Sequence, residues 1–210
     1  MKVAFGRNTN TDYFCQRLKK QLEYIMAINL KKGESYNLTK EFPGVKKLMI
    51  GLGWELTTKQ LDLDASVFMI GSNGKLINNN YLVYFNNLKS ADGALHHTGD
   101  NQTGKGMDDD EAILVNLDAI HKEVTDLVIV VTINEAEEQG HSFGFLKEAY
   151  VRIYDEVSKK EIVKYDLDAE NASNSDIEFA RLHRTNGEWS FTATGKGSGK
   201  GLDGYMEKYS

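Results

Sequence analysis

Apolar and polar residues alternate along most of the chain from residue 28 onward, which is the pattern of half-buried β-strands. Residues 48–52 and 63–69 each place a large or medium apolar side chain at every second position. Residues 81–85, 113–117, 127–133 and 149–154 are rich in β-branched and aromatic side chains and predict further strands. Many short strands predict an all-β fold, a two-sheet antiparallel β-sandwich.

Turn and helix signals between these segments are short. Asn-Gly pairs at 73–74 and 186–187 are the favoured two-residue hairpin turn, and the second pair joins the last predicted hairpin. Helix is expected only in short connections, at residues 117–122 and 174–180. The 19 glycines and the single proline, Pro43, suit many tight turns between strands.

Residues 1–27 have a different pattern, a basic helical one. Phe14, Leu18, Leu22 and Ile25 recur at helical spacing, and the segment carries five bases and two acids, a net charge of +3. Such an amphipathic helix packs on its own domain or on a neighbouring copy, or else contacts an anionic membrane surface or a partner protein. We therefore divide the chain into an N-terminal extension, 1–27, and a sandwich domain, 28–210.

The composition describes one globular domain. The chain has 210 residues, 40% hydrophobic and 27% charged, with a formal charge of −6. Its longest apolar run, residues 127–131, is far short of the roughly 20 residues that span a bilayer, so we expect no transmembrane segment. The start of the chain has no apolar stretch long enough for a secretory signal. No basic patch with interleaved aromatics is present, so nucleic acid is not an expected partner.

A single cysteine, Cys15, excludes an intramolecular disulfide framework and a cysteine-rich zinc site. This cysteine usage is typical of a reducing compartment. We therefore expect a cytoplasmic protein.

Negative charge is concentrated in one window. Residues 92–111 contain six acids and one base, a net charge of −5, so the remainder of the chain carries only −1. Two carboxylates about 5 Å apart at an effective dielectric constant of about 20 repel by about 3 kcal/mol. On a solvated loop, screening removes most of this repulsion, whereas on a loop tied to a sandwich end a proton or a cation must neutralise it.

The glycine-rich acidic loop at residues 99–111 has the donors of a hard cation. Carboxylate, amide and backbone carbonyl oxygens without cysteine favour calcium, which accepts six to eight oxygens in irregular geometry. An EF-hand is excluded, because Lys105 stands where its glycine belongs when Asp100 is counted as the first loop residue. A calcium site here would be assembled from separated segments. Asp62 and Asp64, which point to one face of a strand, either supply the second segment or protect a strand edge from aggregation.

Several motifs stand in the order of a known family. They are Gly-Leu-Gly-Trp at 51–54, Asp-Leu-Asp-Ala-Ser at 62–66, Gly-Asp-Asn at 99–101 with Thr-Gly at 103–104, and Asp-Asp-Glu at 109–111. Over roughly residues 28–202 the chain resembles the tellurium-resistance TerD family. The resemblance implies a cytoplasmic, non-enzymatic, calcium-binding stress-response protein that joins other stress-response proteins in an assembly near the inner membrane surface.

The resemblance also implies a set of Ca²⁺ ligands. Carried over residue by residue, they are Asp62, Asp64, Asp100, Asn101, Asp109, Asp110 and Glu111, with a backbone carbonyl from Gly104. The chain departs from the family pattern at Glu55, where the family usually has Asp. Met107 and Asp108 stand where it usually has an acid followed by glycine, which leaves both one and two bound ions open.

Two other signals favour plain structural roles. Residues 140–144 read Gly-His-Ser-Phe-Gly, which is the spacing of a nucleophile elbow around Ser142. A nucleophile elbow needs a strand before the serine and a helix after it. Here an acidic loop precedes the motif and a strand-like run follows it. We therefore expect no enzyme, and a serine hydrolase stays a third hypothesis. His96 and His97 lack a third soft ligand nearby and are interpreted as polar loop residues rather than zinc ligands.

Overall fold

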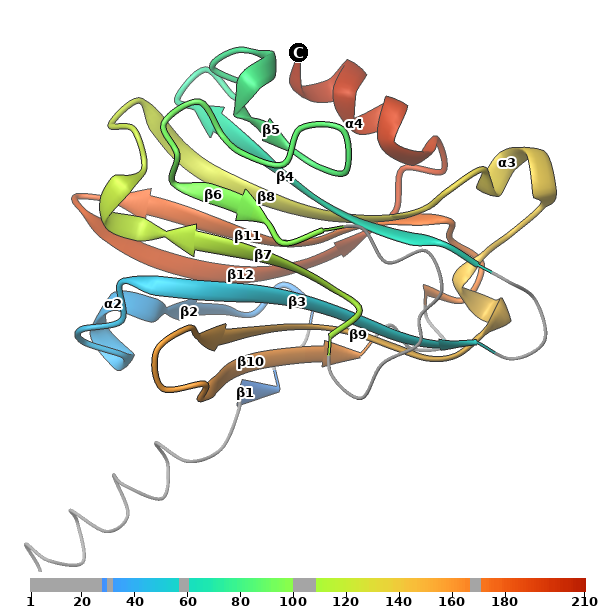
Figure 1. The fold of residues 1–210 in the computed structure, drawn as a ribbon, viewed down its shortest axis with the longest axis horizontal. Coiled ribbons are helices and arrows are strands. Elements are labelled where there is room, and N and C mark those ends of the chain that lie inside the picture. The colour runs from blue at the N-terminus through green and yellow to red at the C-terminus, as the bar shows by residue number, and fades with distance from the viewer. Residues whose placement is uncertain (1–27, 30–31, 57–60, 100–108, 167–170) are drawn as a thin grey trace, which may run out of the picture.

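Two β-sheets pack face to face and form a sandwich in the computed structural model, which describes residues 28–29, 32–56, 61–99, 109–166 and 171–210 (Figure 1). In spatial order, sheet A consists of β1 (Ile28–Asn29), β10 (Glu161–Asp166), β9 (Leu146–Asp155), β3 (Lys47–Leu56), β7 (Glu111–Asn116) and β6 (Leu95–His97). Sheet B consists of β2 (Ser35–Asn37), β12 (Glu188–Lys196), β11 (Asp176–Thr185), β8 (Val124–Ile133), β4 (Leu63–Gly71) and β5 (Leu82–Val83). All pairings among these strands are antiparallel except β1 with β10. The predicted sandwich is confirmed.

The core lies between the sheets and follows from the alternation in the sequence. Leu48, Ile50 and Leu52 of β3 and the inward-facing residues of β4, beginning with Leu63, belong to this core and are almost completely buried. Each strand contributes every second residue because successive side chains of a strand point to opposite faces. The same alternation determines which residues remain on the outer faces.

Most of the predicted strands are confirmed. Residues 48–52, 63–69, 127–133 and 149–154 lie within β3, β4, β8 and β9, and residues 113–116 lie in β7. The predicted turn at 186–187 joins β11 to β12, and both of its residues have positive φ, as a type I′ turn requires. Of residues 81–85, only Leu82 and Val83 form a strand, because Tyr84 and Asn87 bond to each other in a tight turn.

The predicted helix at residues 174–180 is wrong. This segment enters β11, which lies between β12 and β8 in sheet B. Ile177 and Phe179 face the core, and Asp176 and Glu178 face outward. The segment alternates as a strand does, and each of its two outward acids accepts a hydrogen bond from a buried tyrosine. The helix predicted for residues 117–122 is reduced to the 3₁₀ turn η2 (Leu117–Ala119).

The described helices are few and short. They are α2 (Leu38–Glu41), α3 (Ala136–Gln139), α4 (Gly201–Tyr209), η1 (Asn79–Tyr81), η2 and η3 (Phe143–Phe145). In the described ranges, none of them combines the length and the apolar character needed to cross a bilayer. The predicted helix in residues 1–27 lies outside these ranges.

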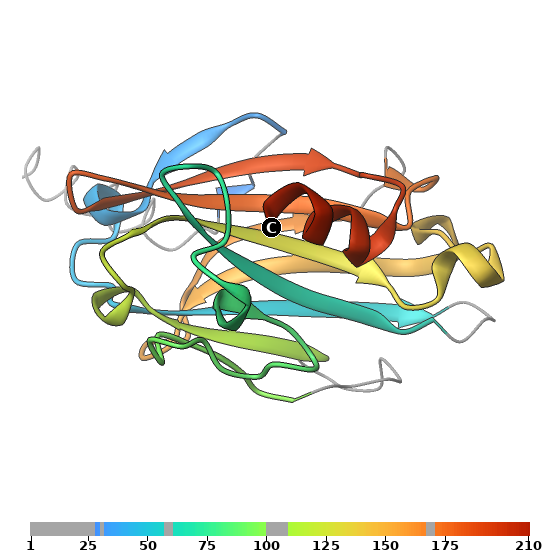
Figure 2. The same ribbon diagram turned by 90° about the horizontal axis from the view of Figure 1, so that it is seen from above.

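The helix α4, which the sequence pattern did not predict, covers the outer face of sheet B. Figure 2 shows it lying over the strands of this sheet. Tyr205 and Tyr209 are only 2–3% exposed and pack on Phe68, Val128 and Val130, the outward residues of β4 and β8. The helix therefore closes an apolar patch that the sandwich alone would leave open.

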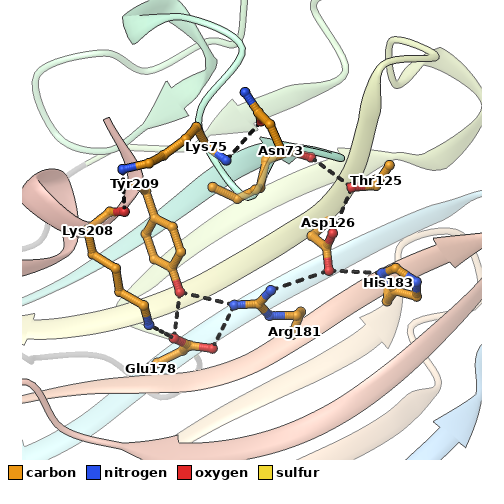
Figure 3. Close-up of polar contacts among 10 residues, drawn as sticks. Asn73, Lys75, Thr125, Asp126, Glu178, Arg181, His183, Lys208 and Tyr209 are labelled. Atoms are coloured by element: carbon orange, nitrogen blue, oxygen red, sulfur yellow. Dashed lines mark hydrogen bonds and ion pairs between the residues drawn. The ribbon is translucent and has the colours of Figure 1, made fainter.

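A buried carboxylate fastens the end of α4 to sheet B (Figure 3). The Glu178 carboxylate accepts hydrogen bonds from Lys208 Nζ at 2.9 Å, from Tyr209 OH at 2.7 Å and from Arg181 Nη2 at 3.2 Å. Burial alone would raise the pKa of Glu178, but the bonds from Lys208 and Tyr209 and the neighbouring cations outweigh burial and lower it below the ordinary value. Glu178 is therefore charged in the folded protein and is held by three donors.

Replacing this carboxylate tests the fastening. Glu178→Gln should lower the free energy of unfolding by about 1–3 kcal/mol near neutral pH, because hydrogen bonds to a charged group are lost. Because the pKa of Glu178 is lower in the folded than in the unfolded protein, its charge stabilises the fold at pH values above the ordinary glutamate pKa of about 4.3. This stabilisation is lost as the pH falls through the pKa of the folded state. The difference between wild type and variant in urea unfolding should therefore shrink in acid. Glu207→Gln, on the exposed face of α4, is the matched control and should change little; an equal effect of both variants would contradict the account.

Candidate metal site

The predicted metal-binding segments meet at one end of the sandwich, the right-hand end in Figure 1. β3 and β8 end there and β4 begins there, while β7 begins further inside the sandwich, with Glu111 opposite Leu52 of β3. The backbone N–H of Ala65 on β4 donates a 2.8 Å hydrogen bond to the Glu111 carboxylate on β7. The acids at 62–64 and 109–111 therefore belong to the same end of the molecule. The other predicted ligands, Asp100, Asn101 and Gly104, lie outside the described residues.

Asp109 lies on the outer face of sheet A, directly over Gly51. A Cβ atom at Gly51 would come within 2.1 Å of Asp109 Oδ2, so only glycine leaves room for this carboxylate. Arg152 Nε donates to Asp109 Oδ1 at 2.7 Å, and Tyr150 OH donates to the same oxygen at 3.3 Å. The other oxygen, Oδ2, is buried and accepts no hydrogen bond from any described residue. This oxygen needs a cation or a further donor.

Asp110 lies in the plane of sheet A, beyond the last β3–β7 pair. Its backbone N–H donates to Leu52 O at 2.8 Å, and its Oδ2 accepts from the backbone N–H of Trp54 at 2.9 Å. The carboxylate thus replaces the next carbonyl that β7 would have offered to β3. Burial raises the pKa of Asp110, the Trp54 bond opposes this, and the adjacent Asp109 charge adds to the rise. Burial therefore disfavours the charged form of Asp110 more than the Trp54 bond favours it.

Glu111 points into the sandwich, and its side chain is fully buried. Besides the bond from Ala65, its Oε2 lies 3.5 Å from Nε2 of His97, which is also fully buried. The backbone N–H of Gly99 donates to Nδ1 of His97, so in the neutral imidazole the proton is assigned to Nε2, facing Glu111. Glu111 therefore joins the two sheets through one buried oxygen.

Asp64 lies on the face of β4 that points away from the core, and Asp62 directly precedes this strand. Asp62 Oδ2 accepts from the side-chain amide of Asn134 at 3.3 Å. Asp64 is 6% exposed and lines a polar cavity of about 300 Å³ together with Thr132 and Lys200, among others. The β4 acids therefore adjoin sheet B, whereas Asp109 adjoins the outer face of sheet A.

The described acids do not form a metal site by themselves. Among the residues that the structure describes, no group of three or more His, Cys, Asp and Glu side chains is close enough to hold a metal ion. The donor chemistry nevertheless fits a hard cation, because the end offers carboxylate oxygens, among them Asp109 Oδ2, which has no hydrogen-bond donor from the described chain.

Three residues at this end were not identified from the sequence. Arg152 and Tyr150 both donate hydrogen bonds to Asp109. The sequence does contain a pattern that indicates their outward direction, because they alternate with the buried residues Ala149, Val151 and Ile153. The interpretation of His97 as a polar loop residue is wrong. It lies in β6 with Leu95 and faces the interior, where it neighbours Glu111.

The environment of Ser142 matches the sequence expectation. The short helix α3 precedes it, and the turn η3 and the strand β9 follow. A nucleophile elbow requires a strand before the serine and a helix after it. The described order is the reverse.

The fold and the site together define a class of protein. Its members are two-sheet β-sandwiches with an acidic end, at which the sequence Asp-Asp-Glu leads into a strand. Residues 26–209 match the TerD domain model, and the chain therefore belongs to the TerD family. It is 38% identical over 187 residues to the tellurium resistance protein TerD of Serratia marcescens, covering 88% of this chain and 97% of that protein. It is 40% identical over 182 residues to general stress protein 16U of Bacillus subtilis (strain 168), covering 84% and 94%.

A solved structure shares the fold. The crystal structure of a homologue of telluride resistance protein (TerD) from Streptomyces coelicolor A3(2) superimposes with a TM-score of 0.66 at 20% sequence identity, covering 78% of this chain and 96% of that one. At this identity the likeness concerns the fold alone.

The contact between Gly51 and Asp109 can be tested by a double-mutant cycle. Gly51→Ala should lower the free energy of unfolding by about 1–3 kcal/mol, because the added methyl group displaces the Asp109 carboxylate from Arg152. With Asp109→Ala already present, the same change should be neutral or stabilising, since glycine weakens a strand interior. Equal costs in both backgrounds, measured by urea unfolding with chelator, would show that Asp109 does not lie over Gly51.

Proposed function

We propose that this member of the tellurium-resistance and stress-response family is a non-enzymatic calcium-binding protein. Calcium, as one ion or as two, would be held by Asp62, Asp64, Asp100, Asn101, Asp109, Asp110 and Glu111 and by the Gly104 carbonyl. The observation that supports this best is the buried Oδ2 of Asp109, which lies beside the acidic loop and accepts no hydrogen bond from the described residues. Its neighbour Asp110 is half-buried, and burial raises the pKa of its carboxyl group.

Each described ligand would contribute in a different way. Asp109 would offer Oδ2 while Arg152 and Tyr150 keep its Oδ1 in place. Asp110 would keep its Oδ2 on Trp54 and so stay at the end of β3. Bound calcium would supply positive charge that offsets the repulsion among the adjacent carboxylates. The chain would supply the oriented oxygens. Because its relatives are named for tellurium resistance and general stress, we propose that calcium binding contributes to a stress response.

Calcium should therefore stabilise the folded protein. A ligand at a hundredfold excess over its dissociation constant adds about 2.7 kcal/mol, which for a chain of this size raises the melting temperature by about 5–10 °C. Magnesium should give a smaller rise, because it demands a tighter octahedral site. Differential scanning fluorimetry with calcium, magnesium or chelator measures both.

A charge-matched control makes this test specific. Replacing Asp109 and Asp110 together by Asn should abolish the calcium response. Replacing the exposed Asp118 and Glu123, in the β7–β8 connection, by their amides removes the same charge and should preserve it. The proposal fails if wild type melts identically in calcium and in chelator, or if the Asp109/Asp110 double variant responds as wild type does.

We propose as an alternative role that the basic segment 1–27 docks the protein on a partner or on the inner membrane surface. The match to the family domain begins at residue 26, so almost all of this segment precedes the domain. Its charge of +3 and its apolar helical stripe suit an acidic partner or an anionic membrane. The proposal places the protein in the cytoplasm, in keeping with the single cysteine.

Removing residues 2–27 should leave the calcium response unchanged and abolish binding to vesicles that contain anionic lipid, or to a partner recovered with the full chain. Co-sedimentation at low and physiological salt measures this. If the shortened chain binds as the full chain does, the segment has no docking role.

A further inference from the structure

Arg152 is the one cation bonded to Asp109 among the described residues. Neighbouring residues of sheet A hold its side chain in position. Its backbone pairs with Gly51 across β9 and β3, so the missing side chain of Gly51 lets Asp109 reach over to the guanidinium. Tyr154 packs against the guanidinium at 5.0 Å from the ring centre. Glu161 lies 3.6 Å from Nη1. Arg152 is thus held from several sides in the position where it meets Asp109.

The guanidinium bonds to only one of the two oxygens of the Asp109 carboxylate. Nε donates to Oδ1, and Oδ2 accepts no bond from the described chain. Asp109 is 5% exposed and Arg152 27% exposed at the side chain, so solvent screens the pair only partly. A divalent ion on Oδ2 would therefore share one carboxylate with a fixed positive charge.

Arg152 is not the only group that orients Asp109. The Tyr150 hydroxyl donates to the same Oδ1, and the space over Gly51 confines the carboxylate. Removal of the guanidinium would thus leave the orientation of Asp109 largely in place while removing the positive charge. The electrostatic effect of Arg152 on a bound ion should then exceed its effect through orientation.

We propose that Arg152 is a resident counter-cation of the calcium site, which neutralises Asp109 when no ion is bound and weakens Ca²⁺ binding when one is. This inference rests on the proposed calcium function. It makes Arg152 a residue that sets the affinity of the site through its charge rather than a ligand. The site would fill only when calcium rises, and the base of the acidic loop would keep its shape in the empty state.

Calorimetric titration of calcium into matched variants tests the sign of the effect. Arg152→Gln should bind calcium at least about tenfold more tightly than wild type and should melt at a lower temperature in chelator. Arg152→Lys keeps the charge and should stay within about threefold of wild type. Tyr150→Phe removes a donor without removing charge and should not tighten binding.

Arg181→Gln is the control for loss of a half-buried arginine. Arg181 lies on the outer face of sheet B, paired with Glu178 and Asp126, and its loss should lower stability without changing calcium affinity (Figure 3). If Arg152→Gln binds calcium as wild type does or more weakly, Arg152 is an orienting group and the inference is overturned.

The outcomes separate the inference from the proposed function. Calcium binding by wild type without tightening in Arg152→Gln refutes the inference alone, whereas absence of binding in every protein refutes the calcium function and the inference with it. If Arg152→Gln is unfolded in chelator, circular dichroism during a calcium titration replaces calorimetry. Folding driven by calcium supports the counter-cation, and failure to fold at any calcium concentration contradicts it.

Discussion

Three consecutive carboxylates at the start of β7 impose the constraint on which this end of the molecule depends. Side chains of adjacent strand residues point in different directions, so no single cation within the chain can neutralise all three. Asp109 turns outward to Arg152, Asp110 stays in the sheet plane and accepts from Trp54, and Glu111 turns inward to Ala65. Each carboxylate is therefore held by a different part of the fold, and together they fix where the acidic loop leaves the sandwich.

The same three contacts explain features of the surrounding strands. Gly51 is required because Asp109 occupies the position of its side chain, and Tyr150 likewise lies over Gly53, where a Cβ would come within 2.5 Å of the ring. The Glu111 carboxylate accepts a hydrogen bond from the backbone N–H of Ala65 on β4 of the opposite sheet, so the acidic segment also ties the sheets together. A cation at this end would act on a segment that is already part of the sandwich structure.

Much of the fold could be predicted from the sequence, because alternation in β3, β4 and β8 reflects burial directly. The helix predicted at residues 174–180 was wrong because the outward Asp176 and Glu178 read as a polar face, whereas α4 covers them. The acidic end was also predictable, since its acids are concentrated in one stretch of sequence. The direction of each carboxylate was not predictable, because it depends on partners such as Arg152 that are distant in sequence.

The central claim is that this acidic end binds a divalent cation through the free side of Asp109. A crystal structure of the protein grown in saturating calcium, with anomalous scattering data collected to identify the metal, tests it most directly. The account predicts an anomalous peak about 2.3–2.6 Å from Asp109 Oδ2, with Arg152 still bonded to Oδ1. A carboxylate held only by Arg152 and Tyr150, with no peak beside it, would contradict the claim.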